Sequence, residues 1–416
     1  MSDMRIAESA TIAGATSGHE ARAAWGAVLS LSVGVFALVT AEFLPASLLT
    51  PMASNLRISY GAAGQAVTAT ALVAAIAAPA VVIGTAKIDR RMVVWGLSLL
   101  LVLSDLLAAA ASNIWVLLTA RVVLGVALGG TWSLAAALAL RLVPARLVAR
   151  AMSIIFTGVT AASVCAPALG AYLGDLWGWR ATFLAASGIG IAALIIQLAT
   201  MPRLPSTDGP TLRTFFLLLR RPRIRTGLIT VMFVISGHFA GFTYVRPFLE
   251  QVSRLDVRTL SMVLLAFGVG GFFGNFAGGI MSGRSPRISV AVGALLLAAT
   301  AFGLLADGSS TGVAFVALAV WGFAFGVLPV SIQTWTTQAA LDHAESAGAL
   351  LVTTFQIAIA AGAILGGVLV DRLGAPGAIG YCGVALLVGA AAMLGLGRSS
   401  VYARHAVGED GLPVAS

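Results

Sequence analysis

Three charged side chains interrupt apolar stretches of this chain, and their types and positions could support proton transfer. Glu42 lies in the run 38–49, three residues before Pro45, and Asp105 lies in the run 97–111. Arg121 lies in a third apolar run. Charged residues inside a bilayer are costly and usually mark an ion or proton path. We therefore consider Glu42, Arg121 and Asp105 as candidate proton-coupling residues.

The composition places these residues in a membrane. Of the 416 residues, 59% are hydrophobic and only 10% are charged, a balance that water-soluble proteins of this length do not normally show. Apolar stretches of about 20 residues recur from Trp25 to Leu396, and this is the length of a helix that crosses a bilayer. We predict an all-α membrane protein with twelve transmembrane helices at 25–48, 62–86, 92–111, 114–140, 151–173, 181–201, 225–248, 259–282, 288–306, 312–338, 346–370 and 376–397.

The longest hydrophilic connection divides these helices into two sets of six. We predict an N-terminal half at 25–201, a cytoplasmic linker at 202–224 and a C-terminal half at 225–397, with cytoplasmic tails at 1–24 and 398–416. The first 24 residues contain acids and no apolar core, so we interpret them as a tail and not as a signal peptide.

The net charge of +9 is a topology signal. Eighteen of the basic residues fall in the tails and the loops on the N-terminal side, against five in the opposite loops. The five are Arg57, Arg180, Arg254, Arg258 and Arg372. By the positive-inside rule both termini are cytoplasmic, and this alternation argues against nucleic-acid binding.

No pattern predicts a metal site, a cofactor or an enzyme. The four histidines are far apart in sequence, and Cys165 and Cys382 fall inside predicted helices without a paired framework. The only lysine, Lys87, is followed by Ile88, so the phosphate loop of an ATP-driven pump or kinase is absent. Intramembrane hydrolysis would need a nucleophile and a base at one depth, and no Ser and His are so placed.

The two halves repeat each other. Gly170, Leu173, Asp175 and Gly178 recur 196 residues later as Gly366, Leu369, Asp371 and Gly374. Pro45, near the end of the first span, has a counterpart in Pro247, near the end of the seventh. Two parallel six-helix halves form an architecture known for transporters. Glycines at four-residue spacing, such as Gly270, Gly274 and Gly278, predict close helix packing and surfaces on which the halves can move.

At this point the residues resemble a known family. Leu117, Arg121, Gly125 and Gly129 reproduce the fourth-helix pattern of the major facilitator superfamily. Ala166, Pro167 and Gly170, followed by Gly178, Trp179, Arg180 and Phe183, look like its antiporter motif and the next loop. Segments 41–58 and 243–250 resemble bacterial purine ribonucleoside efflux pumps of the twelve-helix drug:proton antiporter branch.

The resemblance implies a monomeric transporter in a bacterial inner membrane that exchanges a small organic solute for protons. It also implies conformational roles for Asp89, Arg90 and Arg91 in the loop after the second span, and for Pro167 and Gly170 in the fifth. The chain departs from the family where Ala86 replaces a loop aspartate, and where Ala166 and Ala171 replace glycines. These departures weaken the expected charge lock between the second and eleventh helices and the antiporter motif.

Depth places the three charged residues in one layer. At 1.5 Å per residue, Glu42, Asp105 and Arg121 lie roughly 12–14 Å from the external boundary, close to the midplane. We hypothesise that Glu42 takes up an external proton and exchanges Arg121 for substrate during the cycle. Two structural alternatives remain: a fixed ion pair between Glu42 and Arg121, and neutralisation of Arg121 by Asp105.

A purine nucleoside site would combine an aromatic ring with amides or hydroxyls. The candidates are Trp132 and Ser133 in the fourth span, His238, Tyr244 and Arg246 along the seventh, Gln333 and Trp335 in the tenth, and Gln356 in the eleventh. For the tryptophans the alternative is an interface or lipid-facing ring. Arg246 could instead anchor a helix end by snorkelling, and His238 could be a satisfied packing residue.

Two other function classes remain to be separated from nucleoside export. One is a carrier with broader specificity for drugs, sugars or amino acids, because an acid in the first helix also suits a cationic drug. The other is a receptor or channel, which would not require a twofold repeat of six helices.

Overall fold

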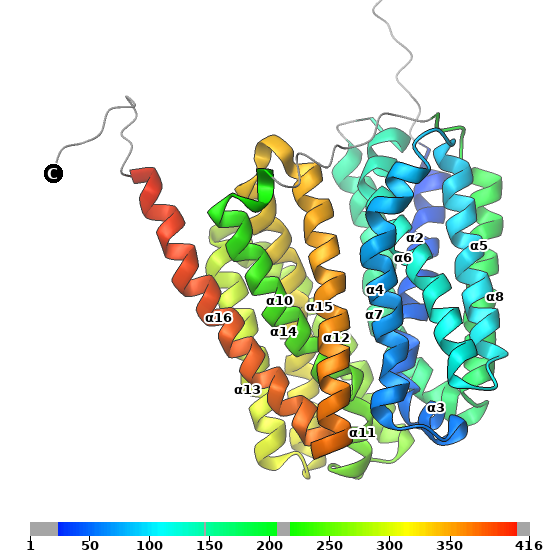
Figure 1. Ribbon diagram of the computed structural model, residues 1–416, viewed down its shortest axis with the longest axis vertical. Coiled ribbons are helices and arrows are strands. Elements are labelled where there is room, and N and C mark those ends of the chain that lie inside the picture. Colours follow the sequence, from blue (N-terminus) through cyan, green and yellow to red (C-terminus); the bar gives the residue numbers. More distant parts are fainter. Residues whose placement is uncertain (1–23, 145–146, 206–216, 406–416) are drawn as a thin grey trace, which may run out of the picture.

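The computed structural model describes residues 24–144, 147–205 and 217–405, and all regular elements within them are helices. Twelve of these helices are long and apolar enough to cross a membrane. The N-terminal half contains α2 (Trp25–Ser47), α4 (Tyr60–Gly84), α5 (Arg90–Ala109), α6 (Ile114–Leu142), α7 (Val148–Leu176) and α8 (Trp179–Thr200). The C-terminal half contains α10 (Pro222–Thr243), α12 (Val257–Arg284), α13 (Pro286–Asp307), α14 (Thr311–Ala339), α15 (Ala344–Leu373) and α16 (Ala375–His405). The predicted twelve-helix fold in two halves is confirmed (Figure 1).

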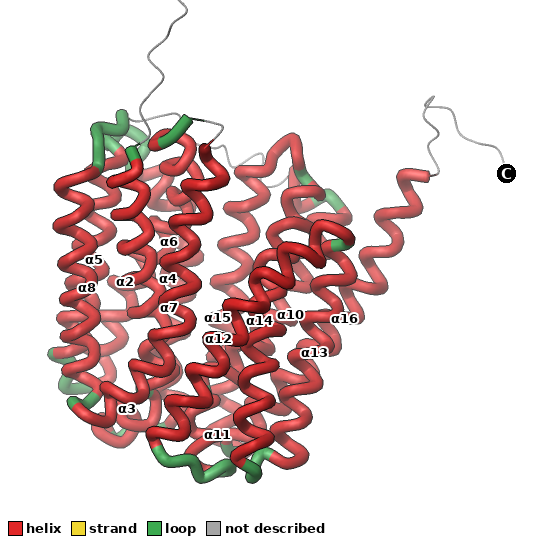
Figure 2. The backbone as a smooth tube through the Cα atoms, turned by 180° about the vertical axis from the view of Figure 1, so that it is seen from behind, coloured by secondary structure: helices red, strands yellow, loops and turns green. Residues whose placement is uncertain are grey.

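The halves are related by the repeat that the sequence shows. They meet along two pairs of helices, α4 with α15 and α7 with α12, and this pairing is symmetric because each pair joins the second helix of one half to the fifth of the other. Figure 2 shows the same two bundles from behind. Gly178 and Gly374, which are 196 residues apart, adopt φ values of +83° and +75° at the starts of α8 and α16. Their recurrence therefore has a backbone cause, since other residues rarely adopt these angles.

The first helix of each half ends in a break followed by a short helix. α3 (Leu49–Leu56) follows α2, and α11 (Val245–Gln251) follows α10. The prediction that the seventh helix runs to 248 is therefore wrong, and Tyr244 and Arg246 lie beyond it. Pro247 explains the early end: its ring clashes with the carbonyl four residues earlier, at Thr243, where α10 stops. In the first turn of α11 the missing N–H of Pro247 costs no intrahelical bond.

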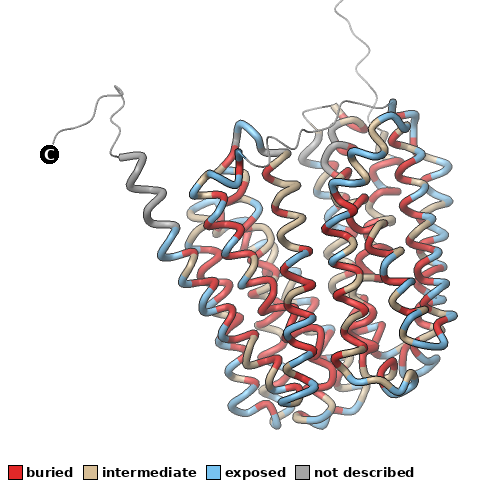
Figure 3. Tube along the Cα trace, viewed as in Figure 1, coloured by how far each residue is buried: buried red, intermediate tan, exposed pale blue. Residues whose placement is uncertain are grey.

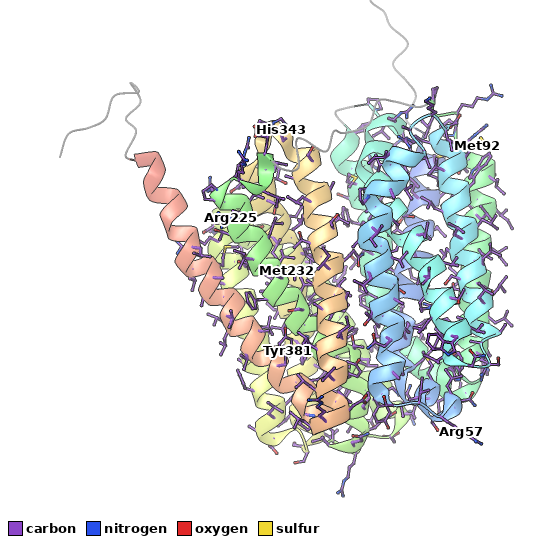
Figure 4. All side chains as sticks on the ribbon, in the orientation of Figure 1. Arg57, Met92, Arg225, Met232, His343 and Tyr381 are labelled. Atoms are coloured by element: carbon purple, nitrogen blue, oxygen red, sulfur yellow. The ribbon has the colours of Figure 1, made fainter. Side chains whose placement is uncertain are left out.

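The bundle has two distinguishable ends. We call the end at which α2 begins proximal and the end that carries α3 and α11 distal. Figure 4 shows Arg225 and His343 toward the proximal end and Arg57 at the distal end. At the proximal end Arg221, which precedes α10, binds Asp342 through both carboxylate oxygens, at 2.6 and 2.5 Å. The Arg221 guanidinium lowers the pKa of Asp342 to about 2, so this carboxylate stays ionised.

Buried residues occupy the interior of each half, and exposed apolar side chains cover the outside (Figure 3). Lipid offers no hydrophobic driving force between helices, so close backbone contact through small residues has to hold them together. α12 and α14 meet in this way: Gly270, Gly274 and Gly322 each bring the two backbones into contact.

Gly274 supplies a test of this packing. A Cβ at Gly274 would lie 2.0 Å from the Phe323 carbonyl oxygen, whereas a Cβ at Gly279 on the same helix would meet nothing within 4 Å. We expect Gly274→Ala to destabilise the detergent-solubilised protein by about 1–3 kcal/mol through overpacking. Gly279→Ala is the control, and its higher helix propensity should leave the thermal unfolding temperature unchanged or raised. Equal unfolding temperatures for the two variants would contradict this packing.

Candidate proton-coupling and substrate site

Arg121 lies at the centre of the N-terminal half with none of its surface exposed. Its Nη1 donates a hydrogen bond of 3.0 Å to the carbonyl oxygen of Ala41 in α2. That carbonyl lacks its usual helical partner, because the residue four positions later is Pro45, which has no N–H. Pro45 thus creates the acceptor that holds Arg121 against α2, at the residue that precedes Glu42.

Asp105 provides the countercharge for Arg121. Its Oδ1 lies 3.8 Å from Nη2 of Arg121, which is an ion pair but too long for a hydrogen bond. The ring of Phe183 in α8 lies under the guanidinium at 4.8 Å. Both oxygens of Asp105, and Nε and Nη2 of Arg121, have no hydrogen-bond partner among the described residues. Buried groups in this condition are rare in proteins, so this pair can gain hydrogen bonds by rearranging.

Glu42 follows Ala41 in α2 and takes no part in this ion pair. Its side chain is half-buried, and within the described residues it makes neither a hydrogen bond nor an ion pair. In this conformation Arg121 is paired with Asp105, as in the alternative in which Asp105 neutralises it. The fixed Glu42–Arg121 pair, the other structural alternative, is absent from the described structure. The role of Glu42 in coupling stays a prediction.

Arg246 repeats this use of a proline-freed carbonyl at the distal end, where it joins the two halves. Its Nη1 donates to the carbonyl oxygen of Ser47 in α2, which is four residues before Pro51 and therefore also has no helical partner. Its Nε donates to Glu250 at 2.7 Å. Arg246 is 4% exposed. Its guanidinium is thus engaged in a contact between the halves, and a role in substrate binding stays a prediction.

A second distal contact joins α15 to the start of α4. The carboxylate of Asp371 accepts hydrogen bonds from Ser59 Oγ at 2.7 Å and from the Gly61 N–H at 2.9 Å. Tyr244 is fully buried beside it, donates to the Ala363 carbonyl at 2.9 Å, and packs against Gly64. Ser59, Asp371, Arg246 and Ser47 form what we call the distal seal. Three hydrogen bonds between the halves belong to it, and they run from Ser59 Oγ and the Gly61 N–H to Asp371 and from Arg246 to the Ser47 carbonyl.

The faces that meet distally become exposed toward the proximal end. On α12 the face of Gly268, which packs against Val164 of α7, continues through Asn275, which is half-buried, to Gly279, which is exposed. On α7 the face of Val164 continues to Thr157 and Ser153, which are both exposed. The halves therefore diverge from a closed distal end toward an open proximal end.

His238 lies in α10 within a set of aromatic rings. Its ring stacks on Phe325 of α14 with centroids 3.7 Å apart, and on Phe242 at 5.4 Å. Phe242 in turn meets Phe43 of α2, in the other half, edge to face at 5.7 Å. The indole N–H of Trp321 donates to Nδ1 of His238 at 3.0 Å. This arrangement brings a predicted substrate residue close to the interface between the halves.

The structure does not bring the other predicted substrate residues together at one place. Trp335 is buried at the proximal end, where its indole N–H donates to the Arg223 carbonyl at 3.0 Å and braces α14 against α10. Gln333 is exposed on the same helix, and Gln356 is buried with Oε1 unpartnered. Trp132 is half-buried against Phe156. Ser133 donates to the Gly130 carbonyl of its own helix.

The predicted conformational residues make their contacts inside the N-terminal half. Asp89 accepts hydrogen bonds from the backbone N–H groups of Arg91 and Leu204. Burial raises the pKa of Asp89, but these bonds outweigh it, and the pKa lies below its usual value. Arg90 binds Thr85, and Arg91 stacks on Trp95 at 4.7 Å. No described contact of these three residues reaches α15, so this conformation has no charge lock there.

In α7 the two predicted residues lie against the first helix. Pro167 is buried within α7. A Cβ on Gly170 would lie 2.5 Å from Ser47 Oγ and 2.9 Å from a Leu44 methyl group. Gly170 thus lets α7 approach the end of α2 that carries the carbonyl bound by Arg246.

Three residues of these sites were missed in the sequence. Asp371 belongs to the internal repeat, but its partners are about 310 residues away and no local pattern predicts them. Phe183 was part of the antiporter resemblance without a stated role. Nothing in the sequence distinguishes Trp321 from the other tryptophans of the membrane spans. The carbonyls of Ala41 and Ser47, which accept from Arg121 and Arg246, could have been found in the sequence. A proline at position i+4 frees the carbonyl of residue i.

A narrow cavity lies between α2, α5, α6, α7 and α8 in the N-terminal half. Its lining is mostly aliphatic. Of its polar residues Ser98, Thr131 and Gln197, the first and last are bonded to each other at 2.6 Å. It is therefore unsuited to a polar solute.

Comparison with known proteins identifies the fold and the relatives. Residues 31–363 match the sequence model of the Major Facilitator Superfamily. The chain is 40% identical over 354 residues to the purine ribonucleoside efflux pump NepI of Salmonella paratyphi B, covering 85% of this chain and 89% of that one. It is also 40% identical over 368 residues to the pump of the same name from Salmonella enteritidis PT4, covering 88% and 93%.

Two solved structures share the architecture. A bacterial homolog of the human lysosomal transporter Spinster, in an inward-facing and occupied conformation, superposes with a TM-score of 0.73 at 16% identity over 90% of this chain and 97% of that one. A D-xylose-proton symporter gives 0.72 at 15% identity, covering 89% and 97%. At these identities the likeness concerns the fold alone. Together with the family match and the 40% identical relatives, it shows that the chain is a multi-pass membrane transporter belonging to the major facilitator superfamily.

Proposed function

We propose that this chain exports purine ribonucleosides in exchange for protons, from the cytoplasmic side of a bacterial inner membrane. The substrate class is supported by the relatives at 40% identity, which are purine ribonucleoside efflux pumps by name. The observation that carries the coupling is Arg121, a fully buried cation whose hydrogen bonds are incomplete and which lies between Asp105 and the turn of α2 that carries Glu42.

The direction of access follows from the packing of the two halves. With the proximal end in the cytoplasm, as the distribution of basic loops predicts, the described conformation faces inward. The distal seal closes the external side, and the exposed proximal faces admit solute from the cytoplasm. Export then requires the seal to break and the proximal faces to close, which is a rocking of one half against the other.

The proton cycle is a competition for Arg121. Its bond to the Ala41 carbonyl is exchangeable, because neither partner depends on it for helix structure. Glu42 is the residue after Ala41 in α2. When Glu42 is deprotonated its negative charge attracts the Arg121 guanidinium, whereas a protonated Glu42 leaves Arg121 paired with Asp105. Loading Glu42 from the external side and unloading it inside would couple these two arrangements to opposite conformations.

A broader drug-efflux carrier is the second candidate. It is favoured by one observation, the unpaired and half-buried Glu42, which could bind a cationic solute directly. The two candidates differ in which compounds should inhibit transport of a labelled nucleoside.

Labelled inosine in inverted vesicles, with an inward-acid pH gradient, tests the proposal. We expect proton-driven inosine uptake that excess unlabelled purine nucleoside suppresses and an amphipathic cation does not.

In Glu42→Gln, acceleration by the pH gradient should be lost while inosine counterflow remains, because the carboxyl is needed for proton exchange and not for the movement of the halves. Asp307→Asn, a carboxylate at the distal end of α13, is the control. A fully gradient-driven Glu42→Gln would refute the coupling role, and suppression by the cation alone would favour the drug carrier.

Pro45→Ala tests the origin of the Arg121 position. The new backbone N–H can bond to the Ala41 carbonyl, so Arg121 loses its acceptor, and we expect proton-driven uptake to fall about tenfold, as for loss of one hydrogen bond to a charged group. Pro79→Ala is the matched control, since Pro79 also lies inside a transmembrane helix and, among the described residues, no arginine bonds to the Ala75 carbonyl that it frees. Similar rates for the two variants would show that Pro45 does not position Arg121.

If the distal seal holds the halves closed, breaking it should make the buried face of α4 accessible to reagents on the external side. In a background without native cysteines, Thr68→Cys places a thiol on the face of α4 that carries Gly61 and Gly64, where it is buried. We expect Asp371→Ala to increase labelling of this thiol by an external impermeant maleimide several-fold, since the contacts to Ser59 and Gly61 are lost. Asp256→Ala is the control, because Asp256 caps α12 within its own half. Unchanged labelling in Asp371→Ala would show that the seal does not hold the halves closed.

A further inference from the structure

The surroundings of His238 leave only one of its atoms free to bind a partner. The Phe325 ring stacks on the imidazole of His238, and the two ring planes are 5° apart. The Phe242 ring is also nearly parallel to the imidazole, at 13°. Trp321 occupies the Nδ1 edge. The remaining polar atom, Nε2, is buried and has no hydrogen-bond partner among the described residues.

Trp321 decides what Nε2 can do. An indole nitrogen is only a donor, so Nδ1 of His238 must accept, and a neutral imidazole that accepts at Nδ1 carries its proton at Nε2. Nε2–H is therefore a donor held in a fixed direction by aromatic rings. A buried donor without a partner is unfavourable by about 1–3 kcal/mol, and a bound ligand with an acceptor would remove this cost.

The position of His238 connects it to the open end of the molecule. On α14, Phe325, Pro329 and Gln333 lie on one face at four-residue spacing, and their exposure rises from half-buried to exposed toward the proximal end. Phe242, next to His238, meets Phe43 of the other half, and Phe43 adjoins Glu42. His238 thus lies between the proximal opening and the proton-coupling residues, with the half-buried Phe325 as the ring that covers it.

Resting on the proposed export of nucleosides, we propose that His238 recognises the purine base by donating from Nε2–H to an acceptor on the edge of the base, and that Trp321 is a positioning residue that fixes this tautomer. The acceptor is the N7 nitrogen or the 6-carbonyl oxygen of the base. Phe325 moves aside as the base enters. If N7 is the acceptor, this hydrogen bond also discriminates against pyrimidine nucleosides, which have no N7.

The wild-type protein gives the first test and needs no substitution. Uptake is measured for inosine, for 7-deazainosine, which lacks N7, and for purine riboside, which lacks the 6-carbonyl. We expect KM to rise about tenfold for one of the two analogues, as for loss of one hydrogen bond to an uncharged acceptor, with little change in the maximal rate. Equal KM values for all three nucleosides would overturn the inference while leaving nucleoside export intact. Absence of inosine transport would instead refute the proposed function.

Two variants then separate recognition from packing. His238→Phe keeps the aromatic stack but removes both ring nitrogens, and we expect the KM for inosine to rise about tenfold and the discrimination against the analogue to disappear. Trp321→Phe leaves the imidazole without a fixed tautomer, so KM should rise by a smaller factor and discrimination should weaken. Membrane abundance and thermal unfolding of each variant report any folding defect. Intact discrimination in His238→Phe would overturn the role of His238, and wild-type behaviour of Trp321→Phe would overturn its positioning role.

Discussion

The structure depends on how a buried guanidinium is satisfied where there is no water. Arg121 cannot leave the membrane interior, and a carboxylate alone does not complete its hydrogen bonds. The chain supplies a backbone carbonyl, made available by Pro45, at a cost of one helical bond in α2. Arg246 uses the same solution through Pro51. Both arginines therefore dock on one helix, six residues apart, and Glu42 lies between the two docking points.

Through these two contacts α2 is linked to both halves of the molecule. Its middle contacts the charge pair of the N-terminal half, and its distal end contacts Arg246 of the C-terminal half. A displacement of α2 that follows a change of charge at Glu42 would act on both contacts. The short helix α11 follows the break after α10 and carries Arg246, so this distal contact lies on a segment that is covalently attached to the first helix of the C-terminal half. In the proposed cycle, proton coupling and closure of the distal side both act through α2.

Movement between the halves requires contacts that are close and yet can separate. Small residues provide this, because Gly61, Gly64 and Gly367 bring backbone and side chains of opposite halves together without interlocking side chains. The hydrogen bonds that Asp371 accepts fix the relative position of α15 and α4, which contact between small residues alone would not fix. The C-terminal half differs in its interior, where aromatic rings around His238 take the place that ions hold in the N-terminal half. The two halves thus share a fold and divide the chemistry between them.

The sequence by itself determined the membrane environment, the twelve spans and the two repeated halves, because hydropathy and an internal repeat can be read from residue types and their positions along the chain. It also contained the prolines that free the acceptors of Arg121 and Arg246. Only the tertiary structure decided that Arg121 pairs with Asp105 while Glu42 is unpaired, and that Arg246 and Tyr244 lie beyond the seventh helix in a contact between halves. It also decided that Trp321 bonds to His238. These outcomes join residues up to 199 positions apart, and their geometry arises from helix packing, which no local pattern encodes.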